Sequence, residues 1–311
     1  MLGTDSSHSM SSAKVFVVAH LYAAIWTTTH AVILLTISLV LLREWMKCAL
    51  LCVLLIYLAH IQYPKSQTII DIFLPVICEC CGGAEILRND LRTDVPKLYC
   101  IHPHGVVANG LGIAMSDCVR RGERPVVAVA SILFWLNPLF RWFVNSMGCD
   151  LTAVTQRNLE AAMVDRRQIA LIPGGFEDVM LMHPGNDVVF LSKRKGFIRL
   201  AMKHGYAVVP VFCFGESLLF RNALRLPENA CRSLAKAHLP VVIPRGESWW
   251  SLLPSAPPKG IRVVFDEPLM MPKNVNPTNS DIDKAHAEYL QKLRLIHRTF
   301  NHYTAITLEI L

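Results

Sequence analysis

The fold prediction for this chain starts from LYCIHPHG, residues 98–105. The first four residues form an apolar run typical of a buried strand, and proline and glycine mark the turn that ends it. Turns after strand ends are where a rigid α/β scaffold presents reactive side chains. Imidazole has an ordinary pKa close to neutrality, so His102 or His104 could act as a general base. Pro103 restricts the backbone of His102, and Gly105 allows another group to approach the backbone closely.

Short apolar runs and helical patterns alternate on both sides of this stretch, which predicts one α/β domain over residues 66–311 with a parallel or mixed sheet. Segment 245–258, with its prolines and two tryptophans, is expected to be a surface loop. The expected strands are Lys97–Ile101, Pro125–Ala130, Ile169–Ile172, Ala207–Phe214 and Gly260–Phe265. The expected helices are Leu111–Arg120, Leu136–Met147, Arg157–Asp165, Gly196–His204 and Ile282–His302.

The N-terminal region is strongly apolar, since Val15–Leu42 and Cys48–Pro64 contain no Asp, Glu, Lys or Arg. A helix needs about 20 apolar residues to cross a bilayer, so the first run is ample and the second is marginal. The second run argues against a cleaved signal peptide, and the missing polar face argues against soluble core helices. A single span plus an in-plane helix is the alternative to a hairpin. We predict a tail at 1–14 and a membrane hairpin at 15–65, with candidate spans at 21–42 and 46–63.

Composition supports a membrane protein, because 52% of the residues are hydrophobic and only 18% are charged. The net charge of +7 suits an anionic bilayer face or a phosphate-bearing substrate, and no nucleic-acid-binding module is present in the sequence. The ten cysteines are scattered, and the CECC cluster at 78–81 lacks the paired spacing of a zinc site. Reduced thiols at a cytosolic membrane surface are therefore expected.

Three further motifs place polar groups at the starts or ends of predicted elements. LIPGGFED, residues 171–178, ends a strand in a glycine turn followed by two acids. Its backbone N–H groups at Gly174 and Gly175 could bind an oxyanion or a phosphate. KRKGF, residues 193–197, is either a solvated basic surface or a binding site for the phosphates of an anionic cofactor. VPVFCFGE, residues 209–216, is another strand that ends in a glycine-acid turn. Adjacent strand ends carrying His and Glu would form one cleft.

The histidine pair has competing interpretations. A metal site would need further carboxylate or histidine ligands close by, and the seven residues after His104 contain none. From the local sequence alone, a role as general base and a purely structural role of the two histidines in a turn are about equally favoured.

In this order, the motifs resemble the type 2 diacylglycerol O-acyltransferase family, which includes monoacylglycerol and wax-alcohol acyltransferases. The resemblance covers nearly the whole chain, and the HPHG tetrapeptide is its most specific part. Two positions depart from the expected pattern. Residues 264–268 read VFDEP where the family has VGEP, and Asn109 stands where the wider glycerolipid acyltransferase superfamily has an aspartate. The other matching segments are the apolar hairpin, PGGFE (173–177), RKGF (194–197), VPV (209–211), FGE (214–216) and EPL (267–269).

The resemblance implies a membrane-anchored, glycerolipid-acyltransferase-like α/β domain that makes triacylglycerol from acyl-CoA and diacylglycerol. Acyl-CoA would be a co-substrate, with no bound cofactor and no metal. His104 would take the proton of the acceptor hydroxyl, and His102 would orient the site or hydrogen-bond the oxyanion. Since Asn109 cannot act as an anion, Glu177 or Asp178 would orient the histidine, and Glu177 is the expected catalytic acid. The substrate-binding candidates are Pro103, Gly105, Asn109, Gly174, Gly175, Arg194 and Lys195.

The resemblance also implies a multi-pass protein of the endoplasmic reticulum membrane whose catalytic domain faces the cytosol, with the lipid droplet surface as a second location. Lys14 and Lys65 favour that orientation, whereas Arg43 and Lys47 oppose it. A monoacylglycerol or a long-chain alcohol is the alternative acceptor. Two other classes stay open, a metal-dependent lipid hydrolase and an inactive lipid-binding scaffold. The sequence leaves homo-oligomerisation undecided.

Overall fold

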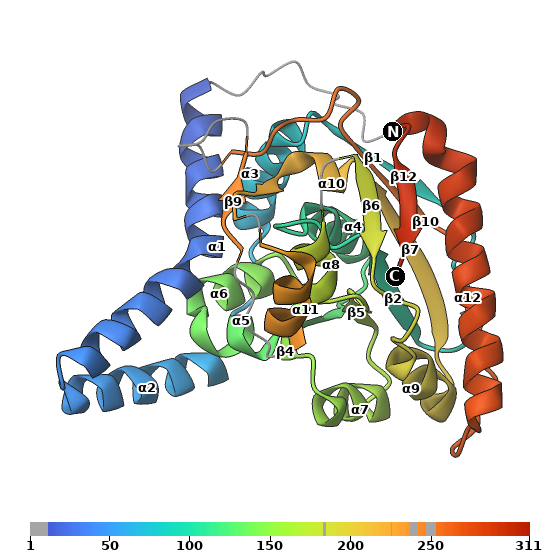
Figure 1. Cartoon of the computed structure of the whole chain (residues 1–311), viewed down its shortest axis with the longest axis horizontal. Coiled ribbons are helices and arrows are strands. Elements are labelled where there is room, and N and C mark those ends of the chain that lie inside the picture. Colours follow the sequence, from blue (N-terminus) through green and yellow to red (C-terminus); the bar gives the residue numbers. More distant parts are fainter. Residues whose placement is uncertain (1–11, 183–184, 225, 237–241, 247–252) are drawn as a thin grey trace.

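The computed structural model describes residues 12–182, 185–224, 226–236, 242–246 and 253–311 (Figure 1). A mixed sheet with strand order β1-β10-β7-β2-β5-β3-β4 lies at its centre, and β11 pairs with the first two residues of β7, ahead of the stretch that pairs with β10. The strands β7, β2, β5, β3 and β4 are parallel, and β10 runs antiparallel to β7. The bounds are β1 Ala84–Arg88, β2 Lys97–His102, β3 Val126–Val129, β4 Asp150–Ala153, β5 Ile169–Leu171, β7 Ala207–Phe214, β10 Ile261–Phe265 and β11 Leu269–Met270.

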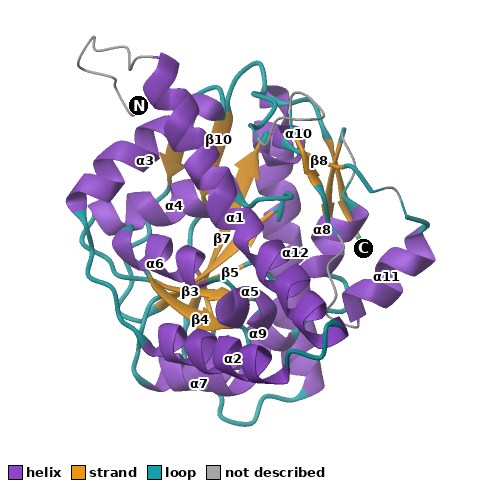
Figure 2. Cartoon of the chain, turned by 90° about the vertical axis from the view of Figure 1, so that its left-hand side faces the viewer, coloured by secondary structure: helices purple, strands orange, loops and turns teal. Residues whose placement is uncertain are grey.

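All five predicted strands are confirmed, and their alternation assigns each side chain to one of two cores. Tyr99 and Ile101 of β2 point into the core beneath α1 (Ser12–Leu41), α3 (Gln67–Cys80) and α4 (Asn109–Arg120). Leu98 and Cys100 point into the opposite core, beneath α7 (Gln156–Val164), α9 (Gly196–His204) and α12 (Asn279–Phe300). Because helices cover both faces of the sheet, its strands read as continuous apolar runs. Figure 1 shows α1 and α12 on opposite sides of the sheet, and Figure 2 shows α1 in front of it.

The predicted helices are confirmed except at Leu136–Met147, which is two helices, α5 (Ser131–Leu136) and α6 (Pro138–Ser146). The break falls at Asn137 because Pro138 occupies the first turn of α6, where a missing N–H does no harm. The Asn137 side chain caps α6 by accepting from the Phe140 N–H at 2.8 Å. Its Nδ2 donates to the carbonyl of Ile25 at 2.7 Å and to the hydroxyl of Thr29 at 3.1 Å. Asn137 therefore attaches α1 to the body of the protein.

Several elements were not predicted from the sequence, among them α3, which has 14 residues, and most of the others are short. Two small sheets pair β6 with β12 and β8 with β9. Part of the predicted loop at 245–258 lies outside the described residues. The additional elements are β6 Asn186–Val189, β8 Arg221–Asn222, β9 Pro244–Arg245, β12 Thr307–Ile310, α8 Phe176–Leu181, α10 Glu216–Leu219, α11 Glu228–Lys236 and the 3₁₀ turn η1 Asn301–Tyr303.

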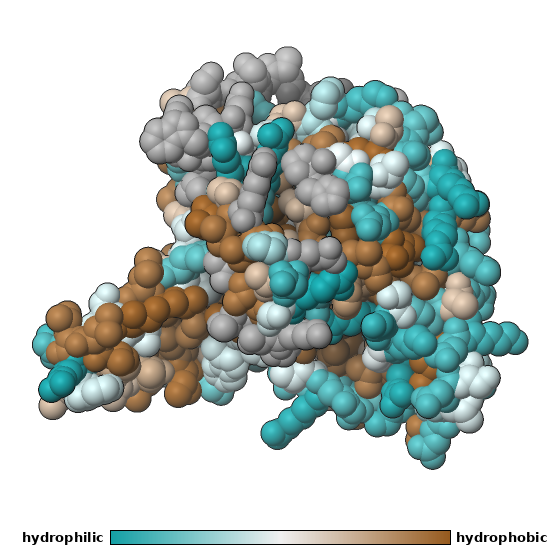
Figure 3. Space-filling model, in the orientation of Figure 1, coloured by the Kyte–Doolittle hydropathy of each residue, from teal (hydrophilic) through white to brown (hydrophobic). Residues whose placement is uncertain are grey.

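The N-terminal apolar runs form α1 and α2 (Trp45–His60), and the second half of α1 projects with α2 from the body as a hydrophobic arm (Figures 1 and 3). Among the described residues, Val15–Leu41 of α1 is long and apolar enough to cross a bilayer, and 11% of its most apolar window is buried. The helix α2 is apolar but shorter. The first half of α1 is part of the main fold, since Val18, Ala19 and Ile25 belong to the core beneath α4.

Candidate functional site

The HPHG turn after β2, the PGGFE turn after β5 and the FGE turn after β7 lie at one edge of the sheet. β2 lies between β5 and β7 and runs parallel to both, with Cys100 opposite Leu171 and His102 opposite Phe212. The loops that follow these strands therefore leave the same edge, as the sequence predicts for the HPHG and PGGFE turns. The FGE turn joins them as a third loop.

His102 is the last residue of β2 and is completely buried. Strand alternation places it on the same face as Leu98 and Cys100, so its ring lies beneath α12. Its Nε2 is 2.7 Å from the Tyr289 hydroxyl, and burial lowers the pKa of His102 to about 3. The ring is therefore neutral at working pH and closed to solvent, which suits a positioning residue better than a base.

His104 follows the cis peptide bond between His102 and Pro103 and is only partly buried. Its Nδ1 lies 2.8 Å from the Gly105 carbonyl, and a carbonyl can only accept, so Nδ1 carries the proton. The Nε2 atom is then the basic nitrogen. Burial lowers the pKa of His104 below its ordinary value, which keeps this nitrogen unprotonated at neutral pH.

Glu216 is the residue of this site that the sequence did not assign. It begins α10 directly after Gly215 and is buried. Its Oε1 accepts from the Asn109 N–H at 3.0 Å and its Oε2 from the Gly110 N–H at 2.7 Å. The N-cap residue of α4 is Ala108, which has a left-handed backbone and no capping side chain. Glu216 therefore supplies the missing cap from another strand end.

The HPHG turn packs directly against this carboxylate. A Cβ on Gly105 would lie 2.4 Å from Glu216 Oε1, and the φ of Gly105 is +64°, so both space and backbone require glycine there. Burial raises the pKa of Glu216 to about 7, although the two N–H groups of α4 act in the opposite direction. The FGE turn is the sequence signal that could have pointed to Glu216. Its contact with Gly110 could not be predicted, because the two residues lie more than one hundred positions apart.

Glu177 and Arg194, two of the predicted site residues, pair with each other. Nη2 of Arg194 donates to Oε1 of Glu177, whose side chain is 9% exposed, whereas that of Arg194 is 42% exposed. Lys195 pairs with Asp283 of α12 at 2.7 Å. Within the described part of the chain, neither Glu177 nor Asp178 hydrogen-bonds to His102 or His104.

The glycine turn after β5 packs closely against the side chain of Asp178. A Cβ on Gly174 would lie 1.9 Å from Asp178 Oδ1, and that oxygen accepts from the Phe190 N–H at 2.6 Å. Burial raises the pKa of Asp178 to about 7. The N–H of Gly175 donates to the Ile172 carbonyl, so this N–H would have to exchange that hydrogen bond to bind an oxyanion, and its predicted role stays a prediction. The turn shapes the start of α8.

Asn109 links the site to the N-terminal arm. It is the first residue of α4 and is 2% exposed, and its Oδ1 accepts from the Tyr22 hydroxyl of α1 at 3.1 Å. Its Nδ2 is buried and faces the Glu216 carboxylate, which it stabilises in the charged form, with a geometry poorer than that of a full hydrogen bond. Across the described residues, no group of three or more His, Cys, Asp or Glu side chains is arranged to hold a metal ion.

Comparison with known proteins identifies relatives over most of the chain. Residues 86–309 match the family described as diacylglycerol acyltransferase. The chain is 28% identical to human 2-acylglycerol O-acyltransferase 1, over 67% of this chain and 66% of that protein. It is 28% identical to mouse acyl-CoA wax alcohol acyltransferase 2, over 69% of each chain, and 29% identical to human diacylglycerol O-acyltransferase 2-like protein 6, over 67% of each. The chain thus spans about two thirds of the length of these relatives.

Proposed function

Because this chain belongs to the diacylglycerol acyltransferase family, we propose that it transfers a fatty acyl group from acyl-CoA to the hydroxyl of diacylglycerol and makes triacylglycerol. The observation that carries this proposal is the geometry of His104. Its Nδ1–H is fixed on the Gly105 carbonyl, which leaves Nε2 as a neutral acceptor in a partly open loop. A neutral hydroxyl is a weak nucleophile, and such a nitrogen is what its activation requires.

In the proposed reaction, His104 Nε2 accepts the proton of the acceptor hydroxyl while its oxygen attacks the thioester carbon. The tetrahedral intermediate collapses, the carbon–sulfur bond breaks, and coenzyme A leaves as a thiol after taking the proton from His104. An ester and free coenzyme A are the products, so the step balances without a metal or an oxidant. His102 holds the strand end through Tyr289, and Glu216 holds the start of α4.

The Arg194 side chain supports binding of the acyl-CoA phosphates. Although it pairs with Glu177, it is substantially exposed, and its guanidinium lies 5.7 Å from the centre of the Phe190 ring. The guanidinium of Arg232 lies 5.6 Å from the same ring. Two cations beside one ring, close to the glycine turn, favour an anionic ligand. Lys195 is likewise paired with an acid, Asp283, and is the second candidate.

The hydrophobic arm supports a membrane location, with residues 15–65 as the membrane region and 66–311 as the catalytic domain. Exposed apolar side chains cover the second half of α1 and much of α2, and they include Leu34, Leu41, Met46, Leu50 and Leu54. Burying this surface in a bilayer removes a large apolar area from water. In this proposal the protein is a multi-pass protein of the endoplasmic reticulum whose catalytic domain faces the cytosol, and it also occupies lipid droplets.

The acceptor is tested by competition. Membranes containing the protein would receive labelled palmitoyl-CoA with equal amounts of diacylglycerol, 2-monoacylglycerol and a long-chain alcohol, and the labelled products would be separated. Triacylglycerol is the expected main product. Diacylglycerol as the main product would make the monoacylglycerol the acceptor, and wax ester as the main product would make the long-chain alcohol the acceptor. Labelled fatty acid without ester would indicate a hydrolase, and no labelled product would overturn acyl transfer.

A further inference from the structure

The segment formed by α5 and α6 carries an exposed apolar surface outside the hydrophobic arm. The sequence of α5 is SILFWL, so every residue after Ser131 is apolar, yet no residue of this helix is buried. Trp135 is 42% exposed, and Leu139, in the first turn of α6, is 48% exposed. We call the helix α5 together with Leu139 the α5 patch. Such a cluster of exposed apolar side chains is typical of an interaction site.

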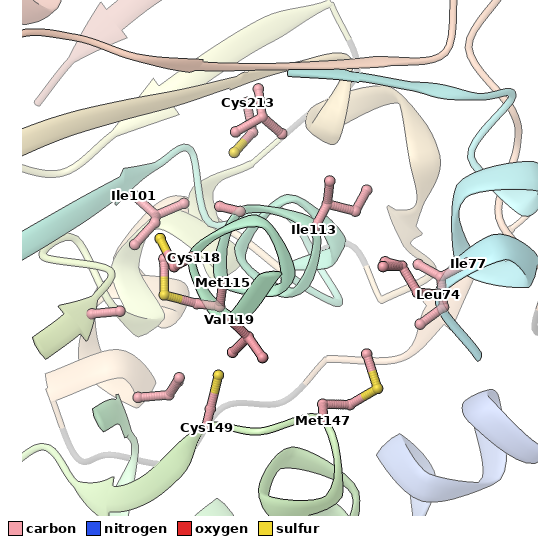
Figure 4. Close-up of a cluster of buried hydrophobic side chains, with 14 of the residues drawn as sticks. Leu74, Ile77, Ile101, Ile113, Met115, Cys118, Val119, Met147, Cys149 and Cys213 are labelled. Atoms are coloured by element: carbon pink, nitrogen blue, oxygen red, sulfur yellow. The ribbon is translucent and has the colours of Figure 1, made fainter. Parts of the chain in front are cut away.

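The inner side of the same segment is already packed in the core. Phe140 and Phe143 of α6 are buried beneath α4, and Leu133 of α5 packs against them from the edge of that core. Figure 4 shows Met147 and Cys149, which follow α6, among the buried side chains around α4. A rotation of the segment that buried the α5 patch would expose this inner side. The patch is therefore available only to a partner outside the fold.

The α5 patch lies at the base of the hydrophobic arm, where α5 packs beside α1 and α2 (Figures 1 and 2). The ring of Trp135 lies 6.2 Å from the ring of His60, the last residue of α2. Tyr57, three residues earlier on α2, is 65% exposed. The Nε of Arg141 donates to the carbonyl of Ile61 at 3.3 Å and so attaches the end of α2 to α6. The patch therefore continues the apolar surface of the arm.

The side chains around this base are of the kinds found at membrane interfaces. Tyrosine and tryptophan concentrate where acyl chains meet headgroups, and lysine and arginine extend from that level toward phosphates. Tyr57 and Trp135 are the exposed aromatic residues here, and Lys65, shortly after α2, is exposed. The guanidinium of Arg141 lies 4.6 Å from the centre of the Phe134 ring. Exposed aromatic and basic side chains beside an apolar arm favour a lipid surface over a protein partner.

We infer that the α5 patch inserts into the boundary between headgroups and acyl chains and forms a membrane contact additional to the arm. Trp135 and Leu139 are the inserted side chains. This inference rests on the membrane location in the proposed function. Burying the two side chains removes apolar area from water, and the inner side of the segment keeps its place in the core.

This contact brings the active edge of the sheet to the membrane surface. The helix α5 begins just after β3, and β3 is separated from β2 by β5, with all three strands parallel. Because neighbouring strands lie about 4.8 Å apart, the end of β3 is about 10 Å from the end of β2, where the HPHG turn begins. A lipid acceptor could then reach this edge from the side without leaving the bilayer.

The test is photo-crosslinking of the full-length protein in phosphatidylcholine vesicles that contain tritiated phosphatidylcholine. Photoreactive p-benzoylphenylalanine would replace Trp135 or Leu139, one position at a time. The same substitution at Leu50 of α2 reports on the arm. Leu295 is the matched control, because it is 62% exposed and lies on α12, on the opposite side of the sheet from α1. After irradiation, the tritium attached to the protein would be measured.

The two patch positions should be labelled as strongly as Leu50 and clearly more than Leu295. Labelling no higher than at Leu295 would overturn the inference. A crosslinked product of two protein chains in place of lipid would also overturn it, because it would assign the patch to contact between copies of the chain. Since Trp135 and Leu139 lie on different helices, one position carries the test if the other variant does not fold.

The Leu50 position separates this inference from the proposed membrane location. If Leu50 is unlabelled while the patch is labelled, the arm assignment fails and the α5 contact stands. If neither is labelled, both fail. Crosslinking requires no acyl transfer, so an inactive protein would refute the proposed reaction and leave this test unchanged.

Discussion

The carboxylate of Glu216 lies 2.7 Å from the backbone nitrogen of Gly110 and joins the end of β7 to the start of α4. It also fills the space beside Gly105 where a side chain would otherwise lie. The HPHG turn, which ends β2, is therefore held between its own strand and the neighbouring one.

Replacing Glu216 by glutamine should weaken this connection. One amide group cannot accept from both N–H groups, because its NH₂ end is a donor. Leaving one buried N–H without a partner should cost about 1–3 kcal/mol of folding free energy, and turnover should fall with it. Thermal unfolding and initial rates would measure both effects. A variant with wild-type stability and rate would show that the contact is dispensable.

Gly105→Ala should abolish most activity, because its Cβ would clash with the carboxylate of Glu216. Gly122→Ala is the matched control. Gly122 also has a positive φ, of +82°, but nothing lies within 4 Å of its Cβ position. Both variants carry backbone strain, so a similar loss in the two would attribute the effect to strain alone.

Tyr289→Phe should slow the reaction without removing the base. The variant loses the hydrogen bond that holds His102, and a net loss of about 1 kcal/mol corresponds to about a fivefold lower rate. Tyr303→Phe serves as a control, because Tyr303 lies in η1 just after α12 and its hydroxyl donates to the Lys259 carbonyl instead. The kcat of Tyr289→Phe should fall with little change in KM for acyl-CoA. An effect confined to KM would place Tyr289 in donor binding.

Arg194→Ala and Glu177→Gln separate two roles of their ion pair. If Arg194 binds coenzyme A phosphates, Arg194→Ala raises KM for acyl-CoA by about tenfold and Glu177→Gln does not. If the pair only holds the α8 turn, both variants lower kcat similarly. The double variant completes the comparison, because paired residues show non-additive effects. We expect the KM effect in Arg194→Ala alone.

The sequence allowed the strand ends to be placed but could not identify their long-range partners. Apolar runs followed by glycine turns located β2, β5 and β7 because buried parallel strands need such composition. Strand alternation put His102 on one face, yet only the tertiary structure shows that Tyr289 of α12 covers it. The contact between Glu216 and Gly110 likewise depends on the order of the strands in the sheet.

For the N-terminal helices, the sequence predicted the elements but not where they pack. Apolar composition predicted the helical segments α1 and α2, but it gave no reason to expect that α1 enters the main core. That arrangement depends on Asn137 and Tyr22, single polar contacts that join α1 to α6 and α4. Pro138 could have revealed the break between α5 and α6, since proline favours the first turn of a helix.

Asp187 should make stability depend on pH. It is buried, accepts from the Ser217 hydroxyl at 2.7 Å and lies 3.8 Å from His297 Nε2. Burial raises the pKa of Asp187 from 3.8 to about 7, so the folded state favours its protonated form. Its stabilising contribution is then complete below about pH 4 and is lost as the pH rises through about 7.

Thermal unfolding of the detergent-solubilised protein and of Asp187→Asn between about pH 3 and about pH 8 would measure this contribution, since these limits lie about one unit outside the two pKa values. Asparagine can still accept from Ser217 but does not titrate. Asp178 and Glu216 also have raised pKa values, and the charge of Asp187 contributes to that of Glu216, so the difference between the two proteins reports Asp187 together with its effect on Glu216. Stability profiles that stay parallel would contradict the assignment.

The most direct measurement of the proposed mechanism is the rate of acyl transfer by His104→Ala across pH, beside wild type and His302→Ala, an exposed histidine. General-base catalysis contributes about 10²–10⁴-fold, so His104→Ala should lose at least about 100-fold in kcat while its expression and membrane association persist. Because the pKa of His104 is lowered, the wild-type rate should be flat at neutral pH and fall only below the ordinary histidine pKa. His302→Ala should match wild type. A His104→Ala protein that keeps its activity within about tenfold of wild type would contradict the role of His104 as the base.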